Sequence, residues 1–314
     1  ERLPSFLKDI SRHDVWYLGK NTSGLAVRFR SNSTSISAKW ELLNNQKMNH
    51  MAETGIKGLD LYCWNNNHWQ FVKVARPKNG KTNEQLIISN MSIEEREYML
   101  FLPLYDGLVS LSIGIDSLSN ITLPQLPYPD TKAPIVVYGT SITQGGCATR
   151  PGMSYTNILT RKLNKEFINL GFSGNGKLDY EIAEIMSKKH EAIMFILDFV
   201  PNVDKEQIIE KTKIFIDILR KENPHTPILL IESVIYTDAS FDKKMLERLL
   251  EKNRTLFAEY KKLRENGDKK LYYLSSEGLI GSDGEATVDG THFTDLGFIR
   301  FSEILSRKIN SILR

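Results

Sequence analysis

The chain has 314 residues, of which 41% are hydrophobic and 25% charged, and its formal net charge is +3. This composition is typical of a globular protein, and the even mixture of charges, without a basic tract, argues against nucleic acid as a partner. No apolar run approaches the roughly 18–20 residues that cross a bilayer, so we predict no membrane span. From the sequence we expect Cys63 and Cys147 to make neither a disulfide framework nor a metal site, which favours free thiols.

The first 123 residues predict an all-β domain. Short segments alternate apolar and polar side chains, as half-buried strands do, and clusters of Asn, Gly, Ser and Lys separate them as turns. Strands at this spacing are typical of a β-sandwich. The predicted strands are 26–30, 36–42, 59–64, 69–75, 85–89, 98–102 and 108–113.

All four tryptophans, Trp16, Trp40, Trp64 and Trp69, fall in this first part. Two interpretations are open for them. They could form a platform on which sugar rings stack, or they could fill the core of the sandwich. The core is favoured, because large aromatic side chains usually supply buried apolar area.

Four prolines follow within residues 124–134. Proline disfavours both the interior of a helix and a central strand, so this segment predicts a linker. We therefore expect a β-sandwich accessory domain over residues 1–123, a proline-rich linker over 124–132 and a second domain over 133–314.

Residues from 133 onward predict an α/β domain. Short apolar strands alternate with stretches whose apolar residues recur every three or four positions, a pattern that indicates a parallel sheet with helices on both faces. In such folds functional residues gather at the carboxyl ends of the strands. The predicted strands are 135–138, 167–171, 192–198, 228–232 and 271–274, and the predicted helices are 154–163, 178–190, 205–221, 241–264 and 294–313.

The first of these strands leads into a candidate nucleophile. It runs into Gly139-Thr140-Ser141, and glycine lets the chain leave a strand sharply because it has no Cβ. Ser141 then lies at the top of the sheet, where its hydroxyl is free to react and its own N–H can point at an oxyanion. Taken alone, Ser141 also suits an ordinary loop serine or helix cap.

A candidate base and acid lie near the C-terminus. Of the six histidines, only His292 follows a carboxylate, Asp289, by three residues within a glycine-containing loop. Asp289 can accept a hydrogen bond from one ring nitrogen of His292 and leave the other facing a serine. A serine, a base and an orienting acid form an activated oxygen nucleophile. His225 lies in a helix-to-strand connection, so we expect it at the opposite end of the sheet.

Two further strand-end loops carry candidate oxyanion donors. Residues 171–176, Gly-Phe-Ser-Gly-Asn-Gly, follow the second strand and can offer the N–H of Gly174. Asn202 follows the third strand and can offer its side-chain amide. Either segment, taken singly, also suits a flexible loop or a helix cap. Arg150 follows the serine closely and is a candidate contact for substrate, with a solvated loop arginine as the alternative.

Together these segments resemble the SGNH (GDSL-type) hydrolase superfamily, in which serine, glycine, asparagine and histidine occur in this order. The resemblance covers residues 133–314 and implies a flavodoxin-like sheet and a serine esterase that needs no metal or organic cofactor. It implies that Ser141, Asp289 and His292 are catalytic and that the oxyanion hole is formed by Ser141, Gly174 and Asn202. The matching blocks are Gly139-Thr140-Ser141, Asn169 to Gly174, Asn202, and Asp289 with His292.

The first part carries a second resemblance. Gly58-Leu59-Asp60-Leu61-Tyr62 is similar to the Gly-x-Asp-Leu-Tyr motif of a jelly-roll-like sandwich domain that precedes some bacterial SGNH esterases. The pattern implies a periplasmic, envelope or secreted bacterial protein acting on small acyl esters, with O-acetyl groups on carbohydrate as the expected substrate. Glu1 is not methionine, and we expect that a signal segment has been removed.

The chain departs from the superfamily pattern at two places. Thr140 stands where an aspartate usually precedes the nucleophile, which affects local hydrogen bonding more than chemistry. The asparagine block reads Asp-Phe-Val-Pro-Asn over residues 198–202, and Asn202 is the amide available there.

Other functions remain open at this stage. The protein could be a carbohydrate-binding or surface-interaction protein with a weak or relict hydrolase site, although the intact Ser141, Asp289 and His292 argue against this. A protease or thioesterase could use the same residues. A small-molecule or glycan ester is the expected partner.

Overall fold

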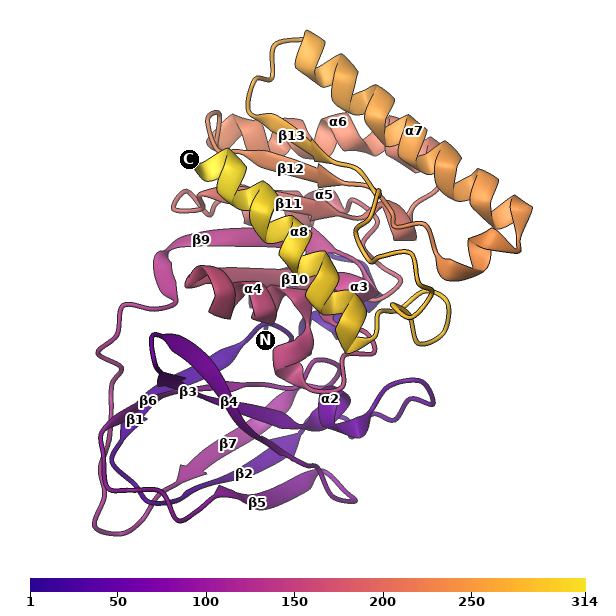
Figure 1. Cartoon of the computed structure of the whole chain (residues 1–314). Coiled ribbons are helices and arrows are strands. Elements are labelled where there is room, and N and C mark those ends of the chain that lie inside the picture. The colour runs from indigo at the N-terminus through magenta and orange to yellow at the C-terminus, as the bar shows by residue number, and fades with distance from the viewer.

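The computed structural model describes all residues from Glu1 to Arg314. It contains two antiparallel sheets, ordered β4-β3-β6-β1-β8 and β5-β2-β7, and one parallel sheet. In Figure 1 the antiparallel sheets form the indigo and purple part, and the parallel sheet with its helices forms the rest. The antiparallel strands are β1 (Ala26–Ser31), β2 (Ile36–Leu42), β3 (Leu59–Asn65), β4 (His68–Ala75), β5 (Thr82–Ile88), β6 (Arg96–Phe101), β7 (Leu108–Gly114) and β8 (Ile121–Thr122).

The two antiparallel sheets share one core, as a sandwich requires. Trp40 from β2 and Leu61 from β3 are buried in it. Strand β3 is buried on both faces, because Leu61 faces the core while Tyr62 packs with Phe101 and Trp69 on the opposite side. The face of β3 that carries Tyr62 lies against the part of the chain with the parallel sheet, because the Tyr62 hydroxyl accepts a hydrogen bond from Arg150.

The parallel sheet has the order β10-β9-β11-β12-β13, the 2-1-3-4-5 arrangement of flavodoxin-like folds. Helices α4 and α8 contact one another beside it, as do α5 and α6, and α6 and α7. The yellow helix α8 crosses the face that also carries α4 (Figure 1). The strands are β9 (Asp130–Gly139), β10 (Lys165–Gly171), β11 (Met194–Asp198), β12 (Ile228–Ile231) and β13 (Leu271–Leu274). The helices are α3 (Ser141–Gln144), α4 (Tyr155–Leu163), α5 (Tyr180–Ser187), α6 (Lys205–Glu222), α7 (Lys243–Glu265) and α8 (Asp295–Leu313).

The fold class predicted from the sequence is confirmed. Side chains of alternate register face the two helical layers: Val137 and Ile196 join the core with α4 and α8, whereas Val136 and Leu197 join the core with α5 and α6. Both faces are therefore covered, which explains why these strands are near-continuous apolar runs. No helix in the chain combines the length and the apolar character needed to span a bilayer.

The prediction that residues 1–123 are all-β is wrong for three short helical segments. A 3₁₀ turn covers Ser5–Asp9, α1 covers His13–Gly19, and α2 covers Glu53–Lys57. Leu3, Leu7 and Val15 are buried in the core of the parallel sheet, not in the sandwich. Each of these segments is too short for a helical pattern of apolar residues to stand out from turn residues.

The tryptophans divide between the two parts. Trp40 and Trp69 are buried in the sandwich region, in keeping with the favoured interpretation. Trp64 is half-buried and its ring stacks on Tyr128, with centroids 5.9 Å apart. Trp16 lies in α1 and packs against the α/β core, so it does not belong to the sandwich.

Candidate active site

Ser141 begins helix α3 directly after β9. A Cβ on Gly139 would lie 2.0 Å from the Thr143 hydroxyl and 2.7 Å from the Asp198 carbonyl oxygen, so only glycine fits at this turn. The Thr140 hydroxyl accepts from the N–H of Ile142 at 3.3 Å and caps α3. Thr140 thus supplies a local hydrogen bond at the position where the superfamily has aspartate. The nucleophile loop is consequently built without a carboxylate at residue 140.

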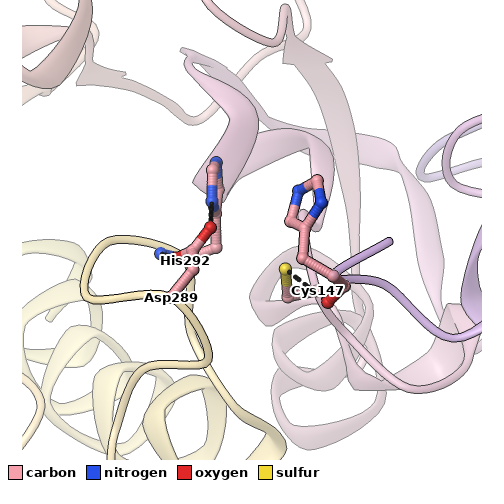
Figure 2. A group of neighbouring side chains, drawn as sticks. Cys147, Asp289 and His292 are labelled. Carbon is pink, nitrogen blue, oxygen red and sulfur yellow. Dashed lines mark hydrogen bonds and ion pairs between the residues drawn. The ribbon is translucent and has the colours of Figure 1, made fainter. Parts of the chain in front are cut away.

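The structure brings Ser141, His292 and Asp289 together, although 151 residues separate the serine from the histidine. The Ser141 Oγ lies 2.9 Å from His292 Nε2, and His292 Nδ1 lies 2.7 Å from Asp289 Oδ2. With Asp289 ionised, Nδ1–H donates to it, and Nε2 is then the acceptor for the serine hydroxyl. Figure 2 shows the carboxylate of Asp289 against the ring of His292.

Asp289 is held by its own loop. Its Oδ1 accepts from the backbone N–H of Thr291 at 3.0 Å and of His292 at 2.8 Å. Burial by itself would raise the pKa of Asp289, but the hydrogen bonds from the His292 side chain and from these N–H groups lower it to about 2. Asp289 therefore stays ionised over the pH range in which enzymes work and can support an imidazolium.

Three hydrogen-bond donors lie on loops at this edge of the sheet. The N–H groups of Ser141 and Gly174 have no acceptor within the protein. Asn202 ends the 3₁₀ turn Val200–Asn202, and its Oδ1 accepts from the N–H of Gly176 at 3.0 Å. That bond fixes the amide orientation and leaves the NH₂ group free to donate. Gly174 has φ +67°, the left-handed region that favours glycine, with open space around it.

Tyr105, which comes from the segment after β6, joins the nucleophile loop to the first part of the chain. Its hydroxyl donates to the Ser141 carbonyl oxygen at 3.2 Å. Tyr105 is buried, and burial raises its pKa well above its usual value. Tyr105 therefore remains a neutral donor. The sequence carried no local signal for it, because its partner lies 36 residues away.

A pocket of about 280 Å³ is lined by Tyr105, whose hydroxyl bonds the Ser141 carbonyl oxygen, and by Ser173, which precedes Gly174. Tyr17 from α1 and Met48 from the loop between β2 and α2 form part of its wall. The remaining lining residues are Asp14, Leu18, Asn21, Gln46 and Asn175. The Gln46 amide donates to the Tyr17 hydroxyl at 2.7 Å, which orders this rim. The pocket is thus lined by more polar than apolar side chains and takes one aromatic ring from the N-terminal helix.

Arg150 was a candidate contact for substrate, but the structure gives its guanidinium other partners. Its Nη1 donates to Asp60 Oδ2 at 2.7 Å and to the Tyr62 hydroxyl at 2.6 Å. The Arg150 guanidinium also lies over the Phe71 ring, 3.9 Å from its centroid. These contacts give Arg150 a structural role, in which Asp60 and Tyr62 of the Gly-x-Asp-Leu-Tyr motif hold the loop that follows Ser141. A contact of Arg150 with substrate stays a prediction.

Asp60→Ala is expected to lower the free energy of unfolding by about 3 kcal/mol, because it leaves the Arg150 guanidinium and the Gly152 N–H without their buried acceptor. Urea unfolding of the two proteins measures the difference. Asp217→Ala removes a pair with Lys213 in which both side chains are about half exposed, and it is the matched control with an expected cost below about 1 kcal/mol. Equal costs for the two variants would show that Asp60 does not hold this loop.

Asp198 is a buried carboxyl beneath the nucleophile loop. Its Oδ2 accepts from the Thr143 hydroxyl at 2.8 Å and from the Tyr155 hydroxyl at 3.0 Å. No cation pairs with it, and burial raises its pKa to about 7 despite these two hydrogen bonds. Its position under α3, away from solvent, indicates a supporting role.

The raised pKa of Asp198 predicts a pH dependence of stability. The unfolded carboxyl ionises near pH 4 and the folded one near pH 7, so the folded state loses stability as pH rises through this window. Asp198→Asn cannot ionise and should gain stability relative to wild type by roughly 2–4 kcal/mol between pH 4.5 and pH 8. Urea unfolding at both pH values tests this. If the difference in free energy of unfolding between the two proteins stayed constant with pH, the raised pKa of Asp198 would be contradicted.

Two neighbours of the triad were not expected from the sequence as part of this region. The His50 ring, from the loop between β2 and α2, lies 5.6 Å from the His292 ring, centroid to centroid. Cys147 is buried, and burial followed by the charge of Asp289 raises its pKa to about 12. A thiol that stays protonated is a poor nucleophile, so Cys147 is not a candidate for that role. Cys63 is likewise free and buried.

Comparison with known proteins gives results for both parts of the chain. The profile of the GDSL-like lipase/acylhydrolase family matches residues 132–310, and the profile of the N-terminus of SGNH-hydrolase-type esterases matches residues 1–121. No curated protein matches the chain. A GDSL-like lipase from Bacteroides ovatus is 39% identical, with a TM-score of 0.93 over 98% of this chain and 90% of that one.

Two more distant structures share the fold. The salicylyl-acyltransferase SsfX3 of a tetracycline biosynthetic pathway is 17% identical, with a TM-score of 0.80, over 99% of this chain and 89% of that one. A family two carbohydrate esterase from Clostridium thermocellum, in complex with cellohexaose, is 15% identical, with a TM-score of 0.63, over 93% of each chain.

Proposed function

The chain belongs to the GDSL-like lipase/acylhydrolase family and is an esterase of that family, and we propose that it removes O-acetyl groups from carbohydrate through an acyl-serine at Ser141. The observation that carries the proposal is the unbroken hydrogen-bonded series from the Ser141 hydroxyl through His292 to Asp289, at 2.9 Å and 2.7 Å. This geometry is what general-base activation of a serine needs.

In the proposed mechanism His292 Nε2 takes the proton from Ser141 Oγ as the oxygen attacks the ester carbonyl carbon. The carbonyl oxygen becomes an oxyanion and accepts from the N–H groups of Ser141 and Gly174 and from the amide of Asn202. Asp289 stabilises the imidazolium. His292 then returns the proton to the departing alcohol, and an acyl-serine remains. Water, deprotonated by His292, releases the carboxylic acid and restores the serine.

The pocket beside the Gly174 loop, lined by both polar and apolar side chains, supports a carbohydrate as the alcohol part of the ester. At about 280 Å³ it is close to the size of a small ligand site. Asp14, Gln46 and Asn175 offer hydrogen-bonding groups for hydroxyls, and the exposed ring of Tyr17 offers an apolar surface for a sugar face. The carbohydrate esterase from Clostridium thermocellum is 15% identical to this chain, and at that identity it shows a common fold alone. The proposal of a carbohydrate substrate therefore rests on this pocket. We further propose a periplasmic, envelope or secreted setting, where acetylated glycans occur.

Acetate release from acetylated xylan and acetylated mannan, beside hydrolysis of p-nitrophenyl acetate and p-nitrophenyl octanoate, tests the proposal. We expect release from at least one glycan and a higher kcat/KM for acetate than for octanoate. Tyr17→Ala should raise KM for the glycan several-fold and leave KM for p-nitrophenyl acetate unchanged, because only the glycan would reach the pocket. Preference for octanoate without release of glycan acetate would identify a lipase-type substrate instead.

A further inference from the structure

Four side chains with metal-binding atoms converge next to the nucleophile. They come from three separate segments: His50 from the loop between β2 and α2, Cys147 from the loop after α3, and Asp289 and His292 from the loop before α8. Their ligand atoms all lie within 4.8 Å of one another. Figure 2 shows Cys147 beside the pair formed by Asp289 and His292. The proposed mechanism uses only Asp289 and His292, so His50 and Cys147 have no role in it.

The donor set has a specific chemistry. One thiol, two imidazoles and one carboxylate are the ligands that Zn²⁺ takes in proteins, and the sulfur disfavours Mg²⁺ and Ca²⁺. In a tetrahedral zinc site with bonds of about 2.0–2.3 Å, the ligand atoms lie roughly 3.4–3.7 Å from one another. The widest separation in the present cluster is therefore about 1 Å too long. His50 is exposed, and its ring hydrogen-bonds only the Asn49 side chain, so its imidazole is free to rotate as the cluster contracts around a metal ion.

Cys147 is held in place for such a role. Its backbone has φ +70°, a left-handed conformation that few non-glycine residues adopt and that persists where surrounding contacts enforce it. Its Sγ donates to the His50 carbonyl oxygen at 3.3 Å, which ties the thiol to the loop that carries His50. The conformation thus keeps the sulfur beside the two histidines.

We propose that a thiophilic divalent cation, Zn²⁺ in the first instance, binds His50, Cys147, Asp289 and His292 and reversibly inhibits the enzyme. On binding, the metal–sulfur bond forms and the thiol proton passes to solvent, with no change in oxidation state. His292 cannot act as metal ligand and general base at once, so metal binding and catalysis exclude one another. The inhibition rests on the proposed function, whereas metal binding does not.

Calorimetric titration with Zn²⁺ tests the site directly. Wild type is expected to bind one Zn²⁺ per chain, and His50→Ala and Cys147→Ser should each weaken binding at least about tenfold, because even residues behind metal ligands change affinity by 10–100-fold. His68→Ala and Cys63→Ser are matched controls, since these residues lie outside the cluster, and they should bind like wild type. Saturable binding that persists in both His50→Ala and Cys147→Ser, or no binding by wild type, would overturn the proposal.

Two further measurements separate failure of this proposal from failure of the proposed function. Co²⁺ bound to wild type should give a sulfur-to-cobalt charge-transfer band that is absent in Cys147→Ser, whether or not the protein hydrolyses any ester tested. Ser141→Ala should bind Zn²⁺ like wild type. In the active protein, Zn²⁺ should suppress hydrolysis and a chelator should restore it, and His50→Ala should raise the half-inhibiting Zn²⁺ concentration at least about tenfold. If wild type and His50→Ala were half-inhibited at the same Zn²⁺ concentration, inhibition through this cluster would be contradicted.

Discussion

Replacing Ser141 by alanine is expected to lower kcat for p-nitrophenyl acetate by about 10⁴–10⁶-fold, with the protein still folded. The variant lacks the oxygen that attacks the carbonyl, and His292 then has no proton to take. Ser141 is buried, and His292 is the only hydrogen-bond partner of its hydroxyl, so the methyl group of alanine fits the same space and leaves no other polar group without a partner.

Steady-state kinetics of wild type and Ser141→Ala measure this loss, with circular dichroism to confirm the fold. Ser311→Ala, an exposed serine in α8 that donates only to the Lys308 carbonyl oxygen, is the matched control and should retain full activity. Turnover by Ser141→Ala within tenfold of wild type would remove Ser141 from the nucleophile role.

Replacing Asn202 should lower kcat by about 100–1,000-fold with little change in KM, because an oxyanion-hole donor acts mainly on the transition state. Asn202 has two functions in the structure. Its Oδ1 holds the N–H of Gly176, and its NH₂ group is free to donate. Asn202→Ala removes both functions, so by itself it cannot distinguish a donor from a residue that positions the loop.

Asn202→Asp makes that distinction. Aspartate keeps an oxygen that accepts from Gly176 but replaces the donor with a second, negatively charged oxygen. If Asn202 donates to the oxyanion, Asn202→Asp should lose at least as much kcat as Asn202→Ala. If the residue serves only to hold the 171–176 loop, Asn202→Asp should recover most of the activity. Kinetics of the two variants side by side decide between these outcomes.

The sequence predicted most of the fold because the pattern of each element is local. The strands β2 and β13 match their predicted ranges residue for residue, since apolar alternation in β2 and a short apolar run in β13 are bounded by turn residues. The N-terminal helices escaped prediction because α1 has seven residues and becomes stable only when Val15 packs on the parallel sheet. The division at residues 124–132 stays a prediction.

The site was predictable only in part. Ser141, Asp289 and His292 stand in short motifs, and their predicted roles remain proposals although the structure brings the three together. The ion pair of Arg150 was not predicted because its partner Asp60 lies 90 residues away, and no local pattern joins a loop arginine to a carboxylate in a strand. His50 was missed for the same reason: its loop reads as a turn, and its closeness to His292 follows from how the two parts of the chain pack.

The central claim is that Ser141 is the activated nucleophile, and covalent labelling tests it most directly. Wild type treated with a fluorophosphonate, which reacts with activated serines, should gain one adduct in its intact mass, and peptide mapping should place it on Ser141. Ser141→Ala should gain none. An adduct on another residue, or equal labelling of the variant, would contradict the claim.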